Sequence, residues 1–169
     1  MMLDSHRSEQ FWQWCLCRYE SKDLRSHLLK AQDVHGLIVM ELMFAAWLAE
    51  QGYPYTRTER AVTGASISPW EHHMVRPLRL QRKRWVDNAQ TAVLYAHAQQ
   101  LELAAERATC SQLVLAYPRF DEPLAPTSLE TCLTVFSLDV PDAAGLMRQL
   151  GEIFVQLRSA DPEVDAGES

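Results

Sequence analysis

Residues 28–49 read LLKAQDVHGLIVMELMFAAWLA, and the second half of this stretch decides the fold. After Gly36 come residues 37–49, in which Glu41 is the only polar side chain. A helix that is apolar on every side has no face for water and must be buried. These residues rise only about 20 Å as a helix, whereas a membrane span needs roughly 20 residues. We therefore predict that residues 37–50 form the buried central helix of a soluble bundle.

Gly36 should separate this central helix from a preceding one. Leu24, Leu28 and Ala31 follow a helical spacing that stops near Asp33. Glycine readily takes the left-handed conformation that closes a helix. The two helices should therefore turn back against each other at this glycine.

Three polar side chains gather at this corner, namely Gln32, Asp33 and His35. One interpretation is a small-ligand or catalytic site, in which Asp33 orients the imidazole of His35 for base catalysis or metal binding. The other is structural, because short polar side chains commonly cap backbone groups at a helix junction. No third ligand or nucleophile lies nearby in the sequence, so we favour the caps. We predict no catalytic residue, no metal and no other cofactor.

A first helix should run over about residues 9–20, with Ser8 as its N-cap. It carries a stripe of apolar side chains at spacings of three and four: Phe11, Trp12, Cys15, Leu16 and Tyr19. This stripe could be a platform on which a ligand or a nucleobase stacks. Aromatic side chains bury large areas, so we favour a place in the core.

Two further helices are predicted in the middle of the chain. Thr56 and Glu59 have the spacing of a capping box, and Gly64 should end the short helix that they begin. A new helix should then start at Pro69, with Ser68 as its N-cap. These signals predict a break in the chain between the two helices.

The helix that starts at Pro69 carries the strongest charge feature of the sequence. Pro77 lies inside it and should bend or break it. Five cations lie within residues 76–84: Arg76, Arg79, Arg82, Lys83 and Arg84. Because arginine binds carboxylates and phosphates in a bidentate manner, this segment could hold phosphate, nucleic acid or an acidic protein. The interpretation that we favour is that the protein's own acids neutralise these charges.

The C-terminal half should add helices near residues 88–115 and 127–138 and a last one from Pro141. Helix 88–115 could pair with a partner chain as a coiled coil, although packing within its own bundle is the interpretation that we favour. From Ser159 the sequence turns polar and acidic. Such a segment could fold back and shield the basic residues.

The domain organisation follows from these elements. We predict a flexible N-terminus (1–7), one helical domain (8–158) and a disordered acidic tail (159–169). With 169 residues, of which 47% are hydrophobic, the chain can bury a real core. The predicted fold is therefore an all-α, single-domain bundle of about seven helices.

Composition narrows the classes of function. A net charge of -6 and a pI near 5.5 argue against a general nucleic-acid binder. The N-terminal sequence lacks a basic stretch followed by an apolar run, so we predict the cytoplasm and no membrane association. The four cysteines show neither zinc-site nor disulfide spacing: Cys15, Cys17, Cys110 and Cys132.

Several patterns occur together in the chain: FWQWCLCRY at 11–19, LLKAQDVHG at 28–36, PW at 69–70 and VRPLR at 75–79. Over roughly residues 11–107 they resemble a family of small bacterial helical proteins that is known as a domain of unknown function. The resemblance implies an all-helical fold and supplies no activity, substrate or catalytic residue. Ile38 and Met40 stand where the family pattern has Asp and Asn. That difference weakens any proposal of a shared polar site on this helix.

Three hypotheses of function remain. The first is a non-catalytic protein–protein interaction protein, an adaptor or regulator whose partner the sequence does not identify. The second is a polyanion or nucleic-acid binder that uses the basic helix 76–84. The third is a small-ligand-binding protein or enzyme with a site near Asp33 and His35. No Gly-rich phosphate loop, Walker motif or GxSxG motif is present to favour a known catalytic class.

Overall fold

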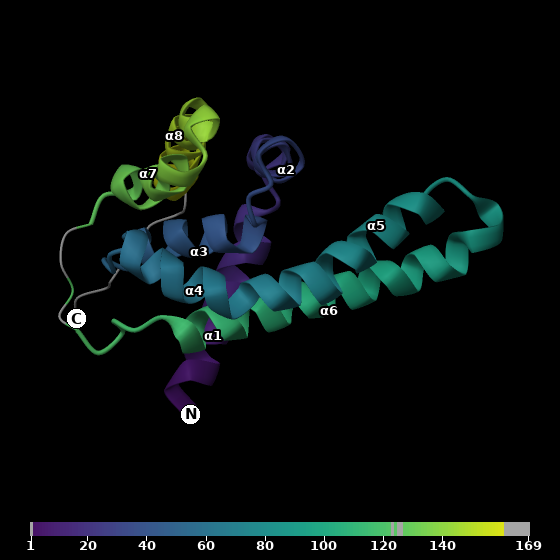
Figure 1. The fold of residues 1–169 in the computed structure, drawn as a ribbon, viewed down its shortest axis with the longest axis horizontal. Coiled ribbons are helices and arrows are strands. Elements are labelled where there is room, and N and C mark those ends of the chain that lie inside the picture. Colours follow the sequence, from purple (N-terminus) through teal and green to yellow (C-terminus); the bar gives the residue numbers. More distant parts are fainter. Residues whose placement is uncertain (1, 123, 125–126, 161–169) are drawn as a thin grey trace, which may run out of the picture.

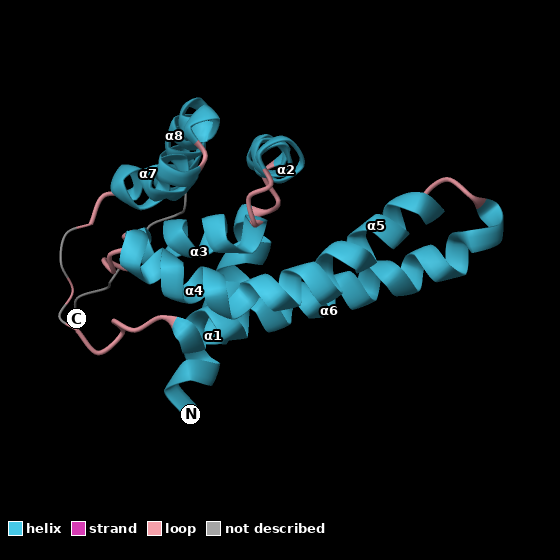
Figure 2. Ribbon diagram, viewed as in Figure 1, coloured by secondary structure: helices cyan, strands magenta, loops and turns pink. Residues whose placement is uncertain are grey.

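The structure is a computed structural model that describes residues 2–122, 124 and 127–160. Figure 2 shows helices joined by loops and no strand in this part of the chain. The α-helices are α1 (Met2–Arg18), α2 (Lys22–His35), α3 (Val39–Glu50), α4 (Arg57–Trp70), α5 (Arg76–Trp85), α6 (Ala92–Ala116), α7 (Leu129–Asp139) and α8 (Ala144–Ala160). A π-helical turn (Glu71–Val75) joins α4 to α5 without a break. Counted with α4 and α5 as one continuous segment, the described residues form seven helical segments. The predicted all-α, single-domain bundle of about seven helices is confirmed.

The helix α3 lies at the centre of the molecule, as predicted. Every side chain from Val39 to Ala49 is buried, and Leu37 before it is buried too. Helices α1, α2, α6 and α7 pack against α3 (Figure 1). Aromatic rings fill part of this core, since the ring centroid of Phe11 lies 5.1 Å from that of Phe44. Because other helices cover α3 on several sides, no face of this helix needs polar side chains.

Gly36 ends α2 in the left-handed conformation, with φ of 67°. Its N–H donates to the carbonyl of Gln32, and the next N–H, of Leu37, donates to the carbonyl of Ala31, both at 3.1 Å. Backbone groups therefore close the helix, as in the glycine-based motif expected from the sequence. The chain reverses at this corner and enters α3.

The first helix begins earlier than the sequence suggests. Residues 2–7, predicted as a flexible N-terminus, form the first turns of α1. The hydroxyl of Ser8 does not cap a helix and instead donates to the backbone carbonyl of Asp4 at 2.8 Å. Serine makes such a bond inside a helix, so its presence alone did not mark the helix start.

The prediction that Gly64 ends one helix and that Ser68 and Pro69 begin another is wrong. The capping box of Thr56 and Glu59 is present, but α4 continues through Gly64 and Pro69 to Trp70. A Cβ atom at Gly64 would lie 3.3 Å from Oε1 of Glu41 in α3. The glycine therefore serves close packing between α4 and α3 and does not serve as a helix end.

Pro77 lies two residues after the end of the π-helical turn. The N–H of Arg76 donates to the carbonyl of Glu71, five residues earlier. A π-helical turn accommodates a position where the regular α-helical bonding fails, as it must at proline. The break that the sequence predicts at Pro77 therefore takes the form of a widened turn ahead of α5.

One part of the molecule projects from its body. The helix α5 and the first half of α6 pack against each other as a hairpin and extend away from the other helices (Figure 1). We call residues 76–104 the arm. The C-terminal half of α6 packs against α1, α3 and α4 and anchors the arm in the core.

The helices α7 and α8 form a second hairpin, which covers α3 and α2. Ser128 caps α7 by accepting a hydrogen bond from the N–H of Thr131 at 3.0 Å, so the helix begins at Leu129, two residues later than predicted. The last helix extends to Ala160, and Ser159 is therefore helical. Residues 161–169 of the predicted acidic tail, and any shielding by them, lie outside the described residues.

Two further observations concern the chain as a whole. Within the described ranges, no helix is both long enough and apolar enough to cross a membrane. All four cysteines are free thiols, and only Cys17 is exposed.

Candidate functional site

The five cations of the basic segment divide into two groups. Arg79 and Arg82 face α6. They form ion pairs with two carboxylates of α6 and one of the π-helical turn. Arg79 donates to Glu102 at 3.0 Å, to Glu106 at 3.1 Å and to Glu71 at 3.3 Å, and only 13% of its side chain is exposed. Arg82 also donates to Glu102. For these two arginines, the protein's own acids neutralise the charge.

The electrostatics of this network follow from its burial. Burial raises the pKa of Glu106, and the attraction of Arg79 only partly offsets that rise. Burial alone would lower the pKa of Arg79, but the three neighbouring carboxylates together raise it. Arg79 is therefore charged at every physiological pH and holds the root of the arm together.

The other three cations, Arg76, Lys83 and Arg84, are exposed on α5. Lys83 Nζ lies 3.4 Å from Oδ1 of Asp33 in α2, and both side chains are about half exposed, at 49% and 52%. Exposed pairs of this kind contribute at most about 1 kcal/mol. Among the described residues, no carboxylate forms an ion pair with Arg76 or Arg84.

A cleft of about 280 Å³ lies between the α2–α3 corner and the π-helical turn with α5. One wall is formed by Gln32, Asp33 and residues 36–38, and the other includes Arg76 and Lys83. Further lining residues are Glu71, His72, Arg79 and Leu80. Two segments that are more than thirty residues apart in the sequence thus contribute to one cleft. Of the predicted site residues, Gln32, Asp33, Arg76, Arg79 and Lys83 come together here.

The remaining predicted site residues lie elsewhere. His35 lines a different hollow, together with Lys30, Asp142 and Arg148. Asp33 and His35 thus line two different hollows. Arg82 and Arg84 do not line the cleft either.

The cleft itself has a limited chemical repertoire. Its lining contains no Ser, Thr, Cys or Tyr that could act as a nucleophile. His72 binds the carbonyl of Ser68 through Nδ1 at 3.0 Å, which leaves Nε2 for a ligand. Hydrogen bonding from Gln32 and the nearby charge of Lys83 lower the pKa of Asp33, so this carboxyl is ionised at neutral pH. The arrangement suits the binding of a charged group better than covalent catalysis.

Sequence reasoning did not assign Glu71, His72 and Leu80 to a site. The signal was present, because residues 72, 76, 80 and 83 follow the three- and four-residue spacing of one helix face. The sequence does not show that the α2–α3 corner lies opposite this helix face. That position depends on tertiary packing alone.

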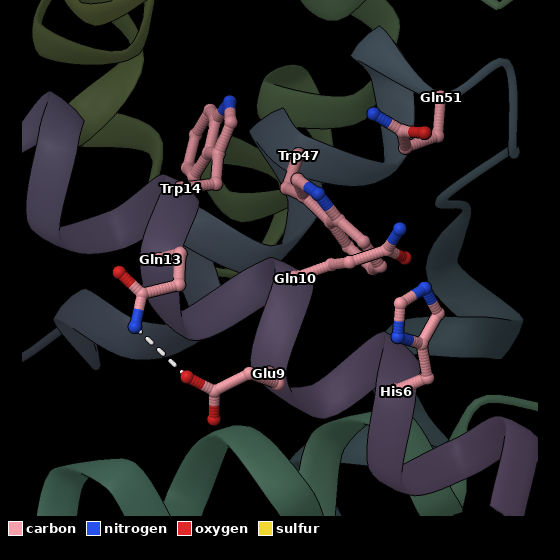
Figure 3. A pocket seen from close by; sticks show the side chains of 7 residues that line it. All are labelled: His6, Glu9, Gln10, Gln13, Trp14, Trp47 and Gln51. Carbon is pink, nitrogen blue, oxygen red and sulfur yellow. Dashed lines mark hydrogen bonds between the residues drawn. The ribbon is translucent and has the colours of Figure 1, made fainter.

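A second hollow, of about 400 Å³, lies between α1 and the end of α3 (Figure 3). Its lining combines two tryptophans with polar side chains: His6, Glu9, Gln10, Gln13, Trp14, Trp47 and Gln51. Trp14 stacks on Phe154, with 5.8 Å between ring centroids, and its Nε1 donates to Glu50 at 2.8 Å. Trp47 is only 4% exposed. Both rings therefore belong to the core and do not offer a free stacking face.

The polar rim of this hollow is also engaged. Figure 3 shows the amide of Gln13 directed at Glu9, and Gln13 Nε2 donates to Glu9 Oε1 at 2.8 Å. Arg107 donates to the other oxygen of Glu9 at 2.6 Å. In α1, Phe11, Trp12 and Cys15 are buried as the core interpretation requires, whereas Leu16 is exposed.

Glu41, the polar residue of α3, is part of an internal network. The hydroxyl of Tyr55 donates to its Oε1 at 3.0 Å, and Nε of Arg60 lies 3.8 Å from the same oxygen. Arg60 also pairs with Asp139 of α7. Burial raises the pKa of Glu41 against the opposing effect of Arg60. This network ties α3, α4 and α7 together and is closed to a ligand.

Comparison with known proteins identifies a family. Residues 10–113 match the family described as Protein of unknown function (DUF2390). No curated protein and no solved structure matches the chain. The matched region contains both walls of the cleft and the whole arm, whereas α7 and α8 lie beyond it. The sequence resemblance is thereby confirmed, and the chain belongs to this family of proteins of unknown function.

Proposed function

We propose that the chain is a non-catalytic interaction protein that binds a partner protein through the exposed face of its arm. The observation that carries this proposal is a concentration of exposed apolar side chains. Six of them are between 47% and 69% exposed: Leu80, Val86, Val93, Leu94, Leu101 and Leu103. A concentration of exposed apolar side chains on one projecting element is typical of interaction sites. Its position on a projecting hairpin gives a partner free access.

The spacing on α6 indicates what kind of partner fits. Leu94 and Leu101 are seven residues apart and share the exposed face of the helix. The next positions at this spacing are Ala108, which is half-buried, and the exposed Leu115. Ala98, Glu102 and Ala105 are instead buried, and Glu102 faces Arg79 and Arg82 of α5. A seven-residue apolar repeat favours pairing with another helix. The proposed partner is therefore a protein that presents an amphipathic helix.

The other two hypotheses receive less support. The polyanion hypothesis requires a strong positive patch, but Arg79 and Arg82 are neutralised by carboxylates of the chain. The enzyme hypothesis requires Asp33 and His35 in one site, but they line different hollows. These observations favour the interaction hypothesis over the other two.

The test is recovery of a defined complex from the cells that normally produce the chain. The double variant Leu94→Ser, Leu101→Ser is compared with Leu138→Ser on α7, because Leu101 and Leu138 are equally exposed at 57%. We expect the wild type and Leu138→Ser to retain a partner in near-equal amount, and the double variant to lose at least about 90% of it. Recovery should persist in high salt, since the contact is apolar. Equal recovery with all three chains would contradict the proposal.

A further inference from the structure

The cleft between the α2–α3 corner and α5 carries charges that the chain does not fully use. Glu71 binds Arg79 at 3.3 Å, so these two lining residues satisfy each other. Asp33 binds Gln32 at 3.1 Å and Lys83 at 3.4 Å. Arg76 lines the same cleft and forms no ion pair with a described carboxylate. The guanidinium of Arg76 is thus the unmatched charge of the cleft.

A second cation lines the same cleft as Arg76. Lys83 has three N–H groups, and its exposed pair with Asp33 occupies them only weakly. His72 also lines the cleft, and its Nδ1 donates to the carbonyl of Ser68. The chain also enters α3 here, and Ile38 at the N-cap supplies no side-chain hydrogen bond. The field of these groups is favourable to an anion.

We propose that this cleft binds the phosphate group of a small ligand, with Arg76 as the principal contact and Lys83 as a further donor. A guanidinium that can donate two parallel hydrogen bonds, with an ammonium group in the same cleft, suits the binding of a phosphate. The cleft volume of about 280 Å³ admits a small phosphorylated molecule and excludes a folded partner. This site is separate from the apolar face of the arm.

The test uses the full chain and inorganic phosphate as the probe. Backbone amide resonances of residues 36–40 are followed by NMR during a titration, with chloride at equal ionic strength as the baseline. We compare Arg76→Gln with Arg84→Gln. Both remove one unpaired cation from α5, but only Arg76 lines the cleft. Neither side chain is buried, so both variants should fold.

The expected result is saturable binding by the wild type and by Arg84→Gln. Arg76→Gln should bind at least about 10-fold more weakly, since a charge-assisted contact is lost. Asp33→Asn should bind a few-fold more tightly, because it removes a competing negative charge beside Lys83. A merely structural role of Asp33 would not produce tighter binding. The variant Leu94→Ser, Leu101→Ser should bind phosphate as the wild type does, which keeps this test independent of the proposed partner.

Two outcomes would overturn the proposal. One is a shift that rises linearly with phosphate throughout the titration, which would show the absence of a site. The other is equal weakening by Arg76→Gln and Arg84→Gln, which would show a diffuse basic surface. In the second case a short single-stranded oligonucleotide should bind with the same dependence on both arginines and with a steep dependence on salt.

Discussion

Nε of Arg79 in α5 donates to Oε1 of Glu102 in α6 at 3.0 Å, and this pair joins the two helices at the root of the arm. The same guanidinium also holds Glu71 and Glu106. A residue that the sequence presents as part of a basic surface is therefore an internal connector. It links α5 to both the π-helical turn and α6.

Replacing Arg79 with Gln should destabilise the protein strongly. Three carboxylates would remain close together without their shared cation, and loss of one partner of a largely buried ion pair costs about 3 kcal/mol. Urea unfolding at neutral pH measures this change. Arg84→Gln, which removes an exposed cation without an ion pair, should change the free energy of unfolding by less than about 0.5 kcal/mol. Equal effects of the two substitutions would contradict the role assigned to Arg79.

The loss in Arg79→Gln should depend on pH. Burial raises the pKa of Glu106 in the folded state, so folding favours its protonated form. The contribution of such a group to stability is present at low pH and is lost as pH rises through the folded pKa. Without Arg79 this pKa should rise further, so the variant should be closer to the wild type at pH 5 than at pH 7.5. A constant difference across this range would refute this explanation.

Glu41→Gln tests the buried network of the central helix. Burial raises the pKa of Glu41 above its unfolded value, so the wild type loses stability as pH rises through the folded pKa. The side chain of the glutamine variant does not titrate, and its amide oxygen can still accept a hydrogen bond from the hydroxyl of Tyr55. The free energy of unfolding of the variant, relative to the wild type, should therefore increase between pH 4.5 and pH 7.5. A trend of the opposite sign would show that Arg60 dominates the carboxylate.

Gly64→Ala should differ from Gly151→Ala although both glycines lie inside helices. At Gly151 a Cβ would meet only Leu133, at an ordinary 3.8 Å, so the substitution should stabilise α8 by about 0.5–1 kcal/mol. At Gly64 the Cβ would approach the buried carboxylate of Glu41 to 3.3 Å. The helical gain should be cancelled or reversed there. Thermal unfolding of both variants checks this, and an equal gain at both positions would refute the packing role of Gly64.

Replacing a leucine with alanine should destabilise the protein strongly in the central helix and hardly at all in the arm. Leu42 in α3 is fully buried, so Leu42→Ala should cost about 2–5 kcal/mol. Leu101 in the arm is largely exposed, so Leu101→Ala should change the stability by less than about 0.5 kcal/mol. Denaturant unfolding of the isolated chain provides the comparison. A large loss in Leu101→Ala would mean that the arm face is covered within the chain itself.

The sequence predicted correctly the features that depend on residues close together in the chain. The burial of α3 followed from a segment without a polar face, and the end of α2 followed from the conformational freedom of Gly36. Both features arise within a few residues. The same reasoning failed at Gly64, because close approach to Glu41 in another helix, and not chain reversal, explains that glycine.

The candidate site shows the same limit. Gln32, Asp33 and the cations of α5 were each recognised from the sequence as polar or charged groups. Their meeting in one cleft, and the separation of His35 from it, depend on how the α2–α3 corner packs against α5. The sequence likewise gave no means of deciding which arginines face α6. Only the tertiary arrangement distinguishes Arg79 from Arg76.

The most direct test of the proposed function is site-specific photo-crosslinking in the cells that normally produce the chain. A benzophenone amino acid is introduced at Leu101 or, as the control, at Leu138, which is equally exposed at 57%. We predict one defined crosslinked adduct from position 101 and none from position 138. The absence of an adduct at position 101, or the same adducts from both positions, would contradict the assignment of the arm as the partner-binding surface.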